Sequence, residues 1–227
     1  MEPAGAHGGE MAEQKKPAKT KHRKNRLEAF SDGVFAIAIT LLVLEIAIPV
    51  EKGEGERLLS GLLHEWPVYL AYFISFMTIG AVWMEHSSLV DAIDHIDGVF
   101  MRLNLVLLLF CAFLPFPTRI MSEFAGDVAG ERVAVVFYGL VLLMMTLMLL
   151  VMGRHAESEG LFGDDLEDER KEKARVKYQL LPGLIAYIVG GALGLLSPKL
   201  GIVIYLLIAI YLAIPIRDVT RLYRKRA

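Results

Sequence analysis

Two polar residues stand inside the first long apolar run of this 227-residue chain, and they are the first candidates for chemistry. The stretch from Arg26 to Pro49 is almost wholly apolar, yet Ser31 and Asp32 lie near its beginning. An ionisable group in a membrane-spanning segment is costly, so it marks an ion path, a proton relay or a polar brace and needs a partner. The helices around Asp32 must therefore supply that partner.

The distribution of apolar residues predicts an all-α, polytopic membrane protein. Hydrophobic residues make up 55% of the chain, and a helix of about 20 of them, at 1.5 Å per residue, crosses a bilayer core of about 30 Å. Six such helices are predicted, over residues 27–49, 66–86, 99–119, 133–153, 178–197 and 199–216. They form one membrane domain, 26–217, between a disordered basic tail at 1–25 and a basic tail at 218–227.

The basic residues predict that both termini lie in the cytoplasm. Seven Lys and Arg precede the first predicted span, six lie between Arg154 and Lys177, and five follow the sixth span. The loops on the opposite side hold five in all. Because Lys and Arg concentrate in cytoplasmic loops, this asymmetry agrees with an even number of spans in a multi-pass protein of the cell membrane.

This orientation places several polar residues of the first three spans at one depth near the inner leaflet. The second span runs back toward the cytoplasm and the third begins there, so their inner ends lie level with the start of the first. The residues concerned are Ser31, Asp32, Trp83, His86, Arg102 and Asn104. They predict a buried polar network in which Asp32 is paired.

The first span also carries an apolar stripe on the side away from Asp32. At about 100° per residue, its members fall near Ile37 on the helix surface: Arg26, Phe30, Gly33, Ile37, Thr40, Leu41, Leu44 and Ile48. Asp32 and Phe35 lie on the opposite side, which predicts that Asp32 points into the helix bundle. A stripe of Ile and Leu is ordinarily a packing surface, and spacing alone gives it no other role.

A family resemblance gives this stripe a second interpretation. The sequence RLEAFSD, residues 26–32, matches the R-x-x-x-F-S-D signature of the transmembrane protein 175 family of potassium channels. The GVFAIAITLLVLEI that follows resembles the family's first helix. The six-span plan is compatible with the family, as are Trp83 and His86, three residues apart in the second predicted span.

The resemblance implies a homotetramer in which the first helix of each subunit lines a central pore for potassium ions, in a bacterial plasma membrane. By position, Ile37 would form the constriction, followed by Thr40 or Leu41 and then Leu44. The motif residues would brace the pore helix, with Arg26 and Asp32 joined to His86 in a network of salt bridges and hydrogen bonds. The residues of motif and network are Arg26, Phe30, Ser31, Asp32, Trp83, His86 and Asn104. Neither a cofactor nor nucleic acid is expected.

Other functions remain open from the residues alone. A six-helix cation transporter coupled to metal or protons is the main alternative, because Asp91, Asp94 and His95 share a helix face and His86 lies nearby. An intramembrane enzyme would need a nucleophile with a histidine partner, and Ser75 and the other buried hydroxyls lack one in sequence, so no enzyme is predicted. A non-conducting scaffold is a further possibility.

The outer loop between the first two predicted spans is rich in glutamate. Glu45 lies just before it and Glu65 at its end. Such a loop is either a solvated surface or an acidic mouth that raises the local concentration of cations.

Overall fold

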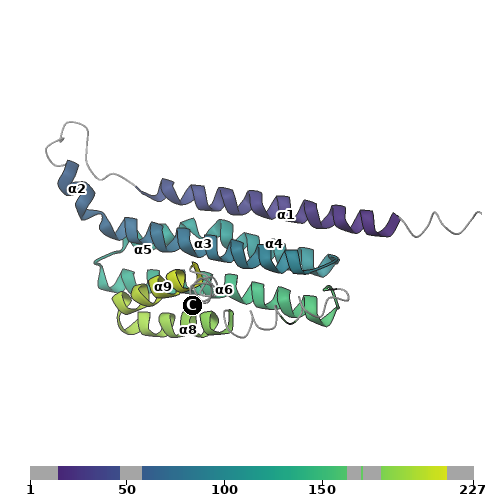
Figure 1. The fold of residues 1–227 in the computed structure, drawn as a ribbon. Coiled ribbons are helices and arrows are strands. Elements are labelled where there is room, and N and C mark those ends of the chain that lie inside the picture. Colours follow the sequence, from purple (N-terminus) through teal and green to yellow (C-terminus); the bar gives the residue numbers. More distant parts are fainter. Residues whose placement is uncertain (1–14, 47–57, 163–169, 171–179, 214–227) are drawn as a thin grey trace, which may run out of the picture.

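Long apolar helices run side by side through the molecule (Figure 1). The computed structural model describes residues 15–46, 58–162, 170 and 180–213, and within these ranges every regular element is helical. This confirms the all-α class. The elements are α1 (Lys15–Leu41), η1 (Leu42–Glu45), α2 (Leu58–His64), α3 (Trp66–Ala92), α4 (Gly98–Phe113), α5 (Pro115–Glu123), α6 (Val128–Ser158), α8 (Leu181–Leu196) and α9 (Pro198–Ala213).

The helices form stacked layers. Helix α1 is the outermost layer and packs on both α3 and α4 (Figure 1). Helix α6 comes next and contacts α4 and α5, and the hairpin of α8 and α9 packs against α6. Within the described ranges, helix α1 is therefore in contact with other helices on one side only.

Four helical segments are long and apolar enough to cross a bilayer. They are His22–Glu45, Trp66–Ala92, Gly98–Glu123 and Val128–Ser158, and they match the first four predicted spans. Helices α8 and α9 have 16 residues each, or about 24 Å at 1.5 Å per residue, which is shorter than a typical hydrocarbon core. The described residues thus establish four candidate spans and two shorter apolar helices.

The ends of several helices differ from the predicted spans. Helix α1 begins at Lys15 rather than near residue 27, so residues 15–25 are helical where a disordered tail was predicted. This segment is rich in Lys, which is a good helix former, and its proline stands in the first turn, where proline is tolerated. Helix α3 continues to Ala92, beyond the predicted end at residue 86. The third span bends at Leu114, where Pro115 starts α5.

Some predictions lie outside the described residues. They concern residues 1–14 of the basic tail, residues 47–49, 178–179 and 214–216 of three spans, and the whole C-terminal tail, 218–227.

One tyrosine fixes the packing of the last two helices. The ring of Tyr205 on α9 is wholly buried between the rings of Tyr138 and Tyr187, and its hydroxyl donates to the Val135 carbonyl at 3.2 Å. Gly139 on α6 and Gly190 on α8 leave the space this ring fills, because a Cβ at either position would overlap it. The absence of side chains at these glycines therefore lets three helices meet.

Candidate functional site

Helix α1 has one buried and one exposed face. The buried residues recur at helical spacing: Leu27, Ser31, Phe35, Ala38 and Leu42. The opposite face carries the predicted pore residues, and Ile37 is 60% and Leu44 72% exposed. Leu41 and Thr40 are exposed as well. The apolar stripe found in the sequence is thus a surface that no other part of the described chain covers.

A chain of three buried polar side chains joins α1 to α4 and α3. The Asn104 amide donates to Ser31 Oγ at 2.9 Å, and its Oδ1 lies 2.8 Å from His86 Nε2. All three side chains are at most 1% exposed. The His86 ring also packs against Phe35, with centroids 5.4 Å apart. In a bilayer interior without water, such a chain fixes α1 at one rotation against its neighbours.

Asp32 lies differently from the prediction. Its carboxylate is exposed rather than directed into the bundle, and Oδ1 accepts a hydrogen bond of 2.8 Å from the Trp83 indole. The buried face is centred near Phe35 and Ala38, so Ser31 points inward and its neighbour Asp32 falls on the flank toward α3. Arg26 is exposed and forms no ion pair with any residue that the structure describes, so the predicted Arg26–Asp32 salt bridge does not form within this chain.

Lys24 ties the start of α1 to the end of α3, a contact that the sequence did not reveal. Its ammonium donates to the backbone carbonyls of Asp91 and Ile93 at 3.1 and 2.8 Å. The last carbonyls of a helix have no partner within the helix and carry partial negative charge, so a lysine satisfies them well. Only the tertiary contact between the two helices brings these groups together.

The C-terminal end of α1 tightens into the short 3₁₀ segment η1, which carries the stripe residue Leu44. One turn earlier, the Thr40 hydroxyl donates to the carbonyls of Ala36 and Ile37, with distances of 3.0 and 2.9 Å. Because its hydrogen is used within the helix, the oxygen of this exposed side chain presents lone pairs outward. Thr40 is therefore an oxygen acceptor on an otherwise apolar face.

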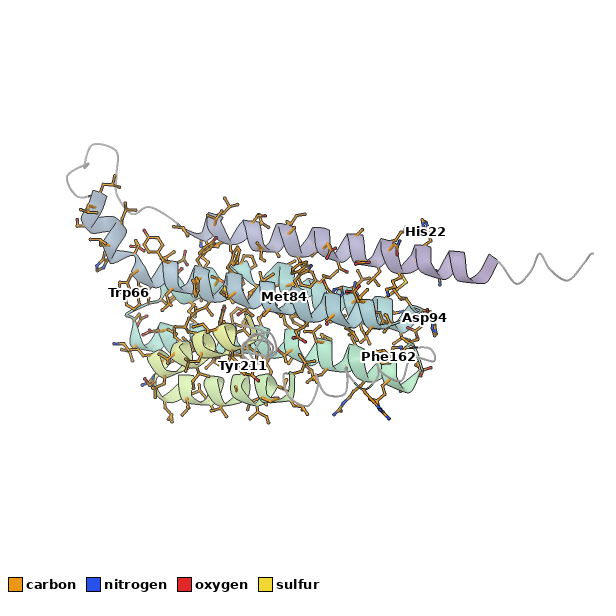
Figure 2. The ribbon with its side chains drawn as sticks, viewed as in Figure 1. His22, Trp66, Met84, Asp94, Phe162 and Tyr211 are labelled. Atoms are coloured by element: carbon orange, nitrogen blue, oxygen red, sulfur yellow. The ribbon has the colours of Figure 1, made fainter. Side chains whose placement is uncertain are left out.

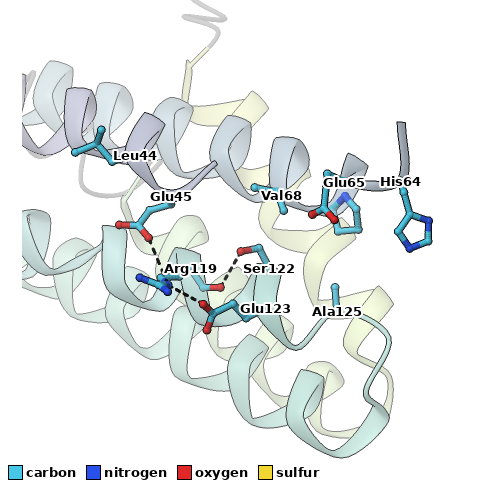
Figure 3. A pocket seen from close by; sticks show the side chains of 10 residues that line it. Leu44, Glu45, His64, Glu65, Val68, Arg119, Ser122, Glu123 and Ala125 are labelled. Atoms are coloured by element: carbon cyan, nitrogen blue, oxygen red, sulfur yellow. Dashed lines mark hydrogen bonds and ion pairs between the residues drawn. The ribbon is translucent and has the colours of Figure 1, made fainter. Parts of the chain in front are cut away.

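A polar pocket of about 430 Å³ lies beside this end of α1 (Figure 3). Arg119 on α5 stands in it, with Nε 2.7 Å from Glu123 and 4.0 Å from Glu45 at the end of η1. Leu44 and Glu65 also line the pocket. The i,i+4 spacing of Arg119 and Glu123 is visible in the sequence, but the approach of Arg119 to Glu45 depends on the bend that starts α5.

Asp97 joins α4 to α6 at the end where α1 begins. Its Oδ1 caps α4 by accepting from the Phe100 N–H at 2.7 Å, and its Oδ2 lies 2.9 Å from His155 Nε2. Burial raises the pKa of this carboxyl, but the hydrogen bond from Phe100 and the contact with His155 outweigh it, so the pKa lies below its usual value. Asp is a common N-cap residue, because its carboxylate accepts a hydrogen bond from the first backbone N–H groups of a helix.

The residues considered for a metal site do not converge. His86 is buried against Asn104, whereas Asp91 and Asp94 are exposed at the end of α3. Across the described ranges, no three His, Cys, Asp or Glu side chains form a group that could hold a metal ion. The metal-coupled transporter therefore gains no support from the geometry of the described residues.

Comparisons with known proteins agree with this arrangement. A sequence profile of the family described as the endosomal/lysosomal potassium channel TMEM175 matches residues 26–115. A potassium channel of Streptomyces collinus is 34% identical over 195 residues, which cover 84% of this chain and 91% of that protein. The TMEM175 proton channel of Gallus gallus is 43% identical over 119 residues, 49% of this chain and 24% of that protein.

A solved structure matches nearly the whole described fold. The crystal structure of a lysosomal potassium-selective channel TMEM175 homolog from Chamaesiphon minutus superposes with a TM-score of 0.76 at 36% identity. The match covers 85% of this chain and 97% of that one. The resemblance carried by the RLEAFSD motif is confirmed, and the chain belongs to the TMEM175 family.

Proposed function

We propose that this chain is one subunit of a homotetrameric, potassium-permeable channel in a bacterial plasma membrane, with the exposed face of α1 lining the pore. The bacterial relatives named as potassium channels support the choice of ion. The membrane domain would span residues 26–217 with no cofactor, and α8 and α9 would complete six crossings with both termini in the cytoplasm.

The observation that carries the proposal is the contrast between the two faces of α1. The Ser31–Asn104–His86 chain holds one face, while Ile37 and Leu44 on the other face are not covered by any part of the chain that the structure describes. A helix fixed so firmly at one rotation, yet covered on one side only, is suited to face its own copies around a central axis.

The chemistry of the exposed face predicts a hydrophobic pore. Four copies of Ile37, Leu41 and Leu44 would make apolar rings that control conduction by wetting and dewetting. The outward lone pairs of Thr40 would add oxygen contacts for a partly dehydrated cation between these rings. Few oxygen ligands face the pore, so we expect modest selectivity for potassium over sodium.

The charges at the two ends of the bundle support the orientation. His22 in the first part of α1, Asp94 after α3 and Phe162 after α6 lie at one end, and Trp66 at the start of α3 lies at the other (Figure 2). The Lys and Arg residues before the first predicted span, and those that follow α6 in the sequence, are therefore joined to the bundle at the first end. By the positive-inside rule this end would be cytoplasmic, with the Glu45–Arg119 pocket outside.

Replacing Ile37 by asparagine tests the pore assignment. A polar side chain in the narrowest ring would remove the dewetting barrier, so potassium current in planar bilayers should rise severalfold and sodium should permeate more readily. Ile185→Asn is the matched control, since Ile185 on α8 is 59% exposed but far from α1 in sequence and layer. An Ile37→Asn channel that conducts like the parent would contradict the assignment.

Proton permeation is a second candidate, because the vertebrate relative is named a proton channel. Reversal potentials in opposed potassium and proton gradients distinguish the two ions. A potential that follows the potassium gradient supports the proposal, and one that follows only the proton gradient contradicts it.

A further inference from the structure

An open groove of about 420 Å³ lies between α1 and α4, at the opposite end of α1 from the constriction residues. It is lined by Arg23, Arg26, Leu27, Phe30, Met101, Asn104 and Leu105. Arg26 and Phe30 lie on the same stripe of α1 as the proposed pore residues, but none of the constriction positions Ile37, Thr40, Leu41 and Leu44 lines the groove. The groove is therefore a second surface feature with its own chemistry.

One end of the groove is strongly basic. Arg23 and Arg26 are one helical turn apart on α1, and both are exposed. None of the lining residues is acidic, and neither arginine forms an ion pair with any residue in the described ranges. Glu28, the nearest carboxylate along α1, is not among the residues that line the groove, and Asp32 accepts from Trp83 on the flank that faces α3. No acidic side chain therefore lines the groove beside the two arginines.

The rest of the groove is apolar. Phe30 on α1 is 54% exposed, and Leu105 and Met101 on α4 are 55% and 42% exposed. The one polar lining residue beneath them, Asn104, already uses its amide in the bonds to Ser31 and His86. A ligand that fits must therefore combine an anionic head with a hydrocarbon tail.

We propose that this groove binds an anionic phospholipid of the cytoplasmic leaflet. The phosphate would lie between Arg23 and Arg26, because guanidinium groups bind phosphate oxygens in a bidentate manner. One acyl chain would lie along Phe30 and Leu105. Basic pockets between membrane helices on the cytoplasmic side recognise such headgroups. The assignment of the lipid to the cytoplasmic leaflet depends on the membrane orientation proposed above. The choice of an anionic phospholipid as the ligand depends only on the residues that line the groove.

The experiment measures lipid retained by the purified full-length protein. Native mass spectrometry after incubation with phosphatidylglycerol or phosphatidylcholine should show retention of phosphatidylglycerol only. Arg23→Gln lies outside the signature motif and should weaken retention about fivefold, since one basic residue near a membrane surface contributes about 1 kcal/mol. Arg154→Gln is the matched control, because Arg154 on α6 is also exposed near the same end but distant from the groove.

A second variant and competition with inorganic phosphate distinguish a bound lipid from a free anion or a second copy of the chain in the groove. Leu105→Trp, which fills the apolar part without changing charge, should also lower retention of the lipid, and inorganic phosphate should not displace it. Equal retention of the two lipids, or full retention by both variants, would overturn the proposal. If Arg23→Gln instead alters the number of subunits and leaves lipid retention unchanged, the groove is a contact between copies. Because the readout is binding, its outcome is independent of whether the channel conducts.

Discussion

Helix α1 and the block of α6, α8 and α9 are both apolar, but they are stabilised in different ways. In the most apolar part of α1 28% of the residues are buried, against 56% in α6. The C-terminal block closes on itself around Tyr205, whereas α1 relies on a few polar contacts and leaves its other face open. The proposed function therefore belongs to α1, the region that is less fully covered by the rest of the described chain.

The largest expected effect lies in the C-terminal block. Gly139→Ala would place a methyl group within the volume of the Tyr205 side chain. Relief of this overlap requires the ring, and with it the packing of α6, α8 and α9, to shift. Overpacking of this kind costs about 1 to 3 kcal/mol or more, so the yield of folded protein and its melting temperature in detergent should fall sharply.

Gly80→Ala on α3 is the control for Gly139→Ala. A Cβ at Gly80 meets nothing within 4 Å, so this variant should fold like the parent. If Gly139→Ala and Gly80→Ala have the same melting temperature, the close packing of Tyr205 against the glycines does not stabilise the α6–α8–α9 block.

The next effect concerns the polar contacts of α1. Asn104→Leu removes both bonds of the buried chain to Ser31 and His86 and should lower the free energy of unfolding by about 1 to 3 kcal/mol. Asp32→Asn keeps an acceptor for Trp83 at an exposed site, so it should change stability by less than about 0.5 kcal/mol.

Thermal unfolding followed by circular dichroism compares the Asn104 and Asp32 variants directly. We expect the conspicuous acidic residue of the motif to matter less for stability than the neutral asparagine. The reverse order would mean that Asp32 is the main brace of the pore helix.

Much of this arrangement was predictable from the sequence, and the failures have physical causes. Long apolar runs fixed the order of the helices, and the stripe from Ile37 to Leu44 is exposed as helical spacing allowed. The inward residue was predicted wrongly, because Ser31 and Asp32 differ by only about 100° and a helical wheel does not give the centre of the buried arc. Phe35 and Ala38 set that centre by packing on α3 and α4.

The contacts at the ends of α1 could not be predicted for a different reason. Lys24 binds carbonyls at the end of α3, and Arg119 approaches Glu45 across the bend before α5. Both depend on where another helix ends, and helix ends are the least certain part of a sequence-based prediction. The sequence supplied suitable side chains in each case but not the distance between them.

The last effect concerns the link between the two regions through α4, which packs on α1. The Asp97 carboxylate caps α4 and contacts His155 on α6. Asp97→Ala should cost about 0.5 to 2 kcal/mol at neutral pH through loss of the cap, and Asp97→Asn less, since asparagine also caps helices. The pKa of Asp97 is lower in the folded state than the usual value of 3.8 for an aspartate. Its stabilisation is therefore complete above the unfolded pKa and lost as the pH falls through the folded one. The difference in melting temperature between parent and Asp97→Ala should thus hold from pH 7 to about 5 and shrink below about 4. A difference that stays constant down to about pH 2 would show that the charge of Asp97 does not help to join the two regions.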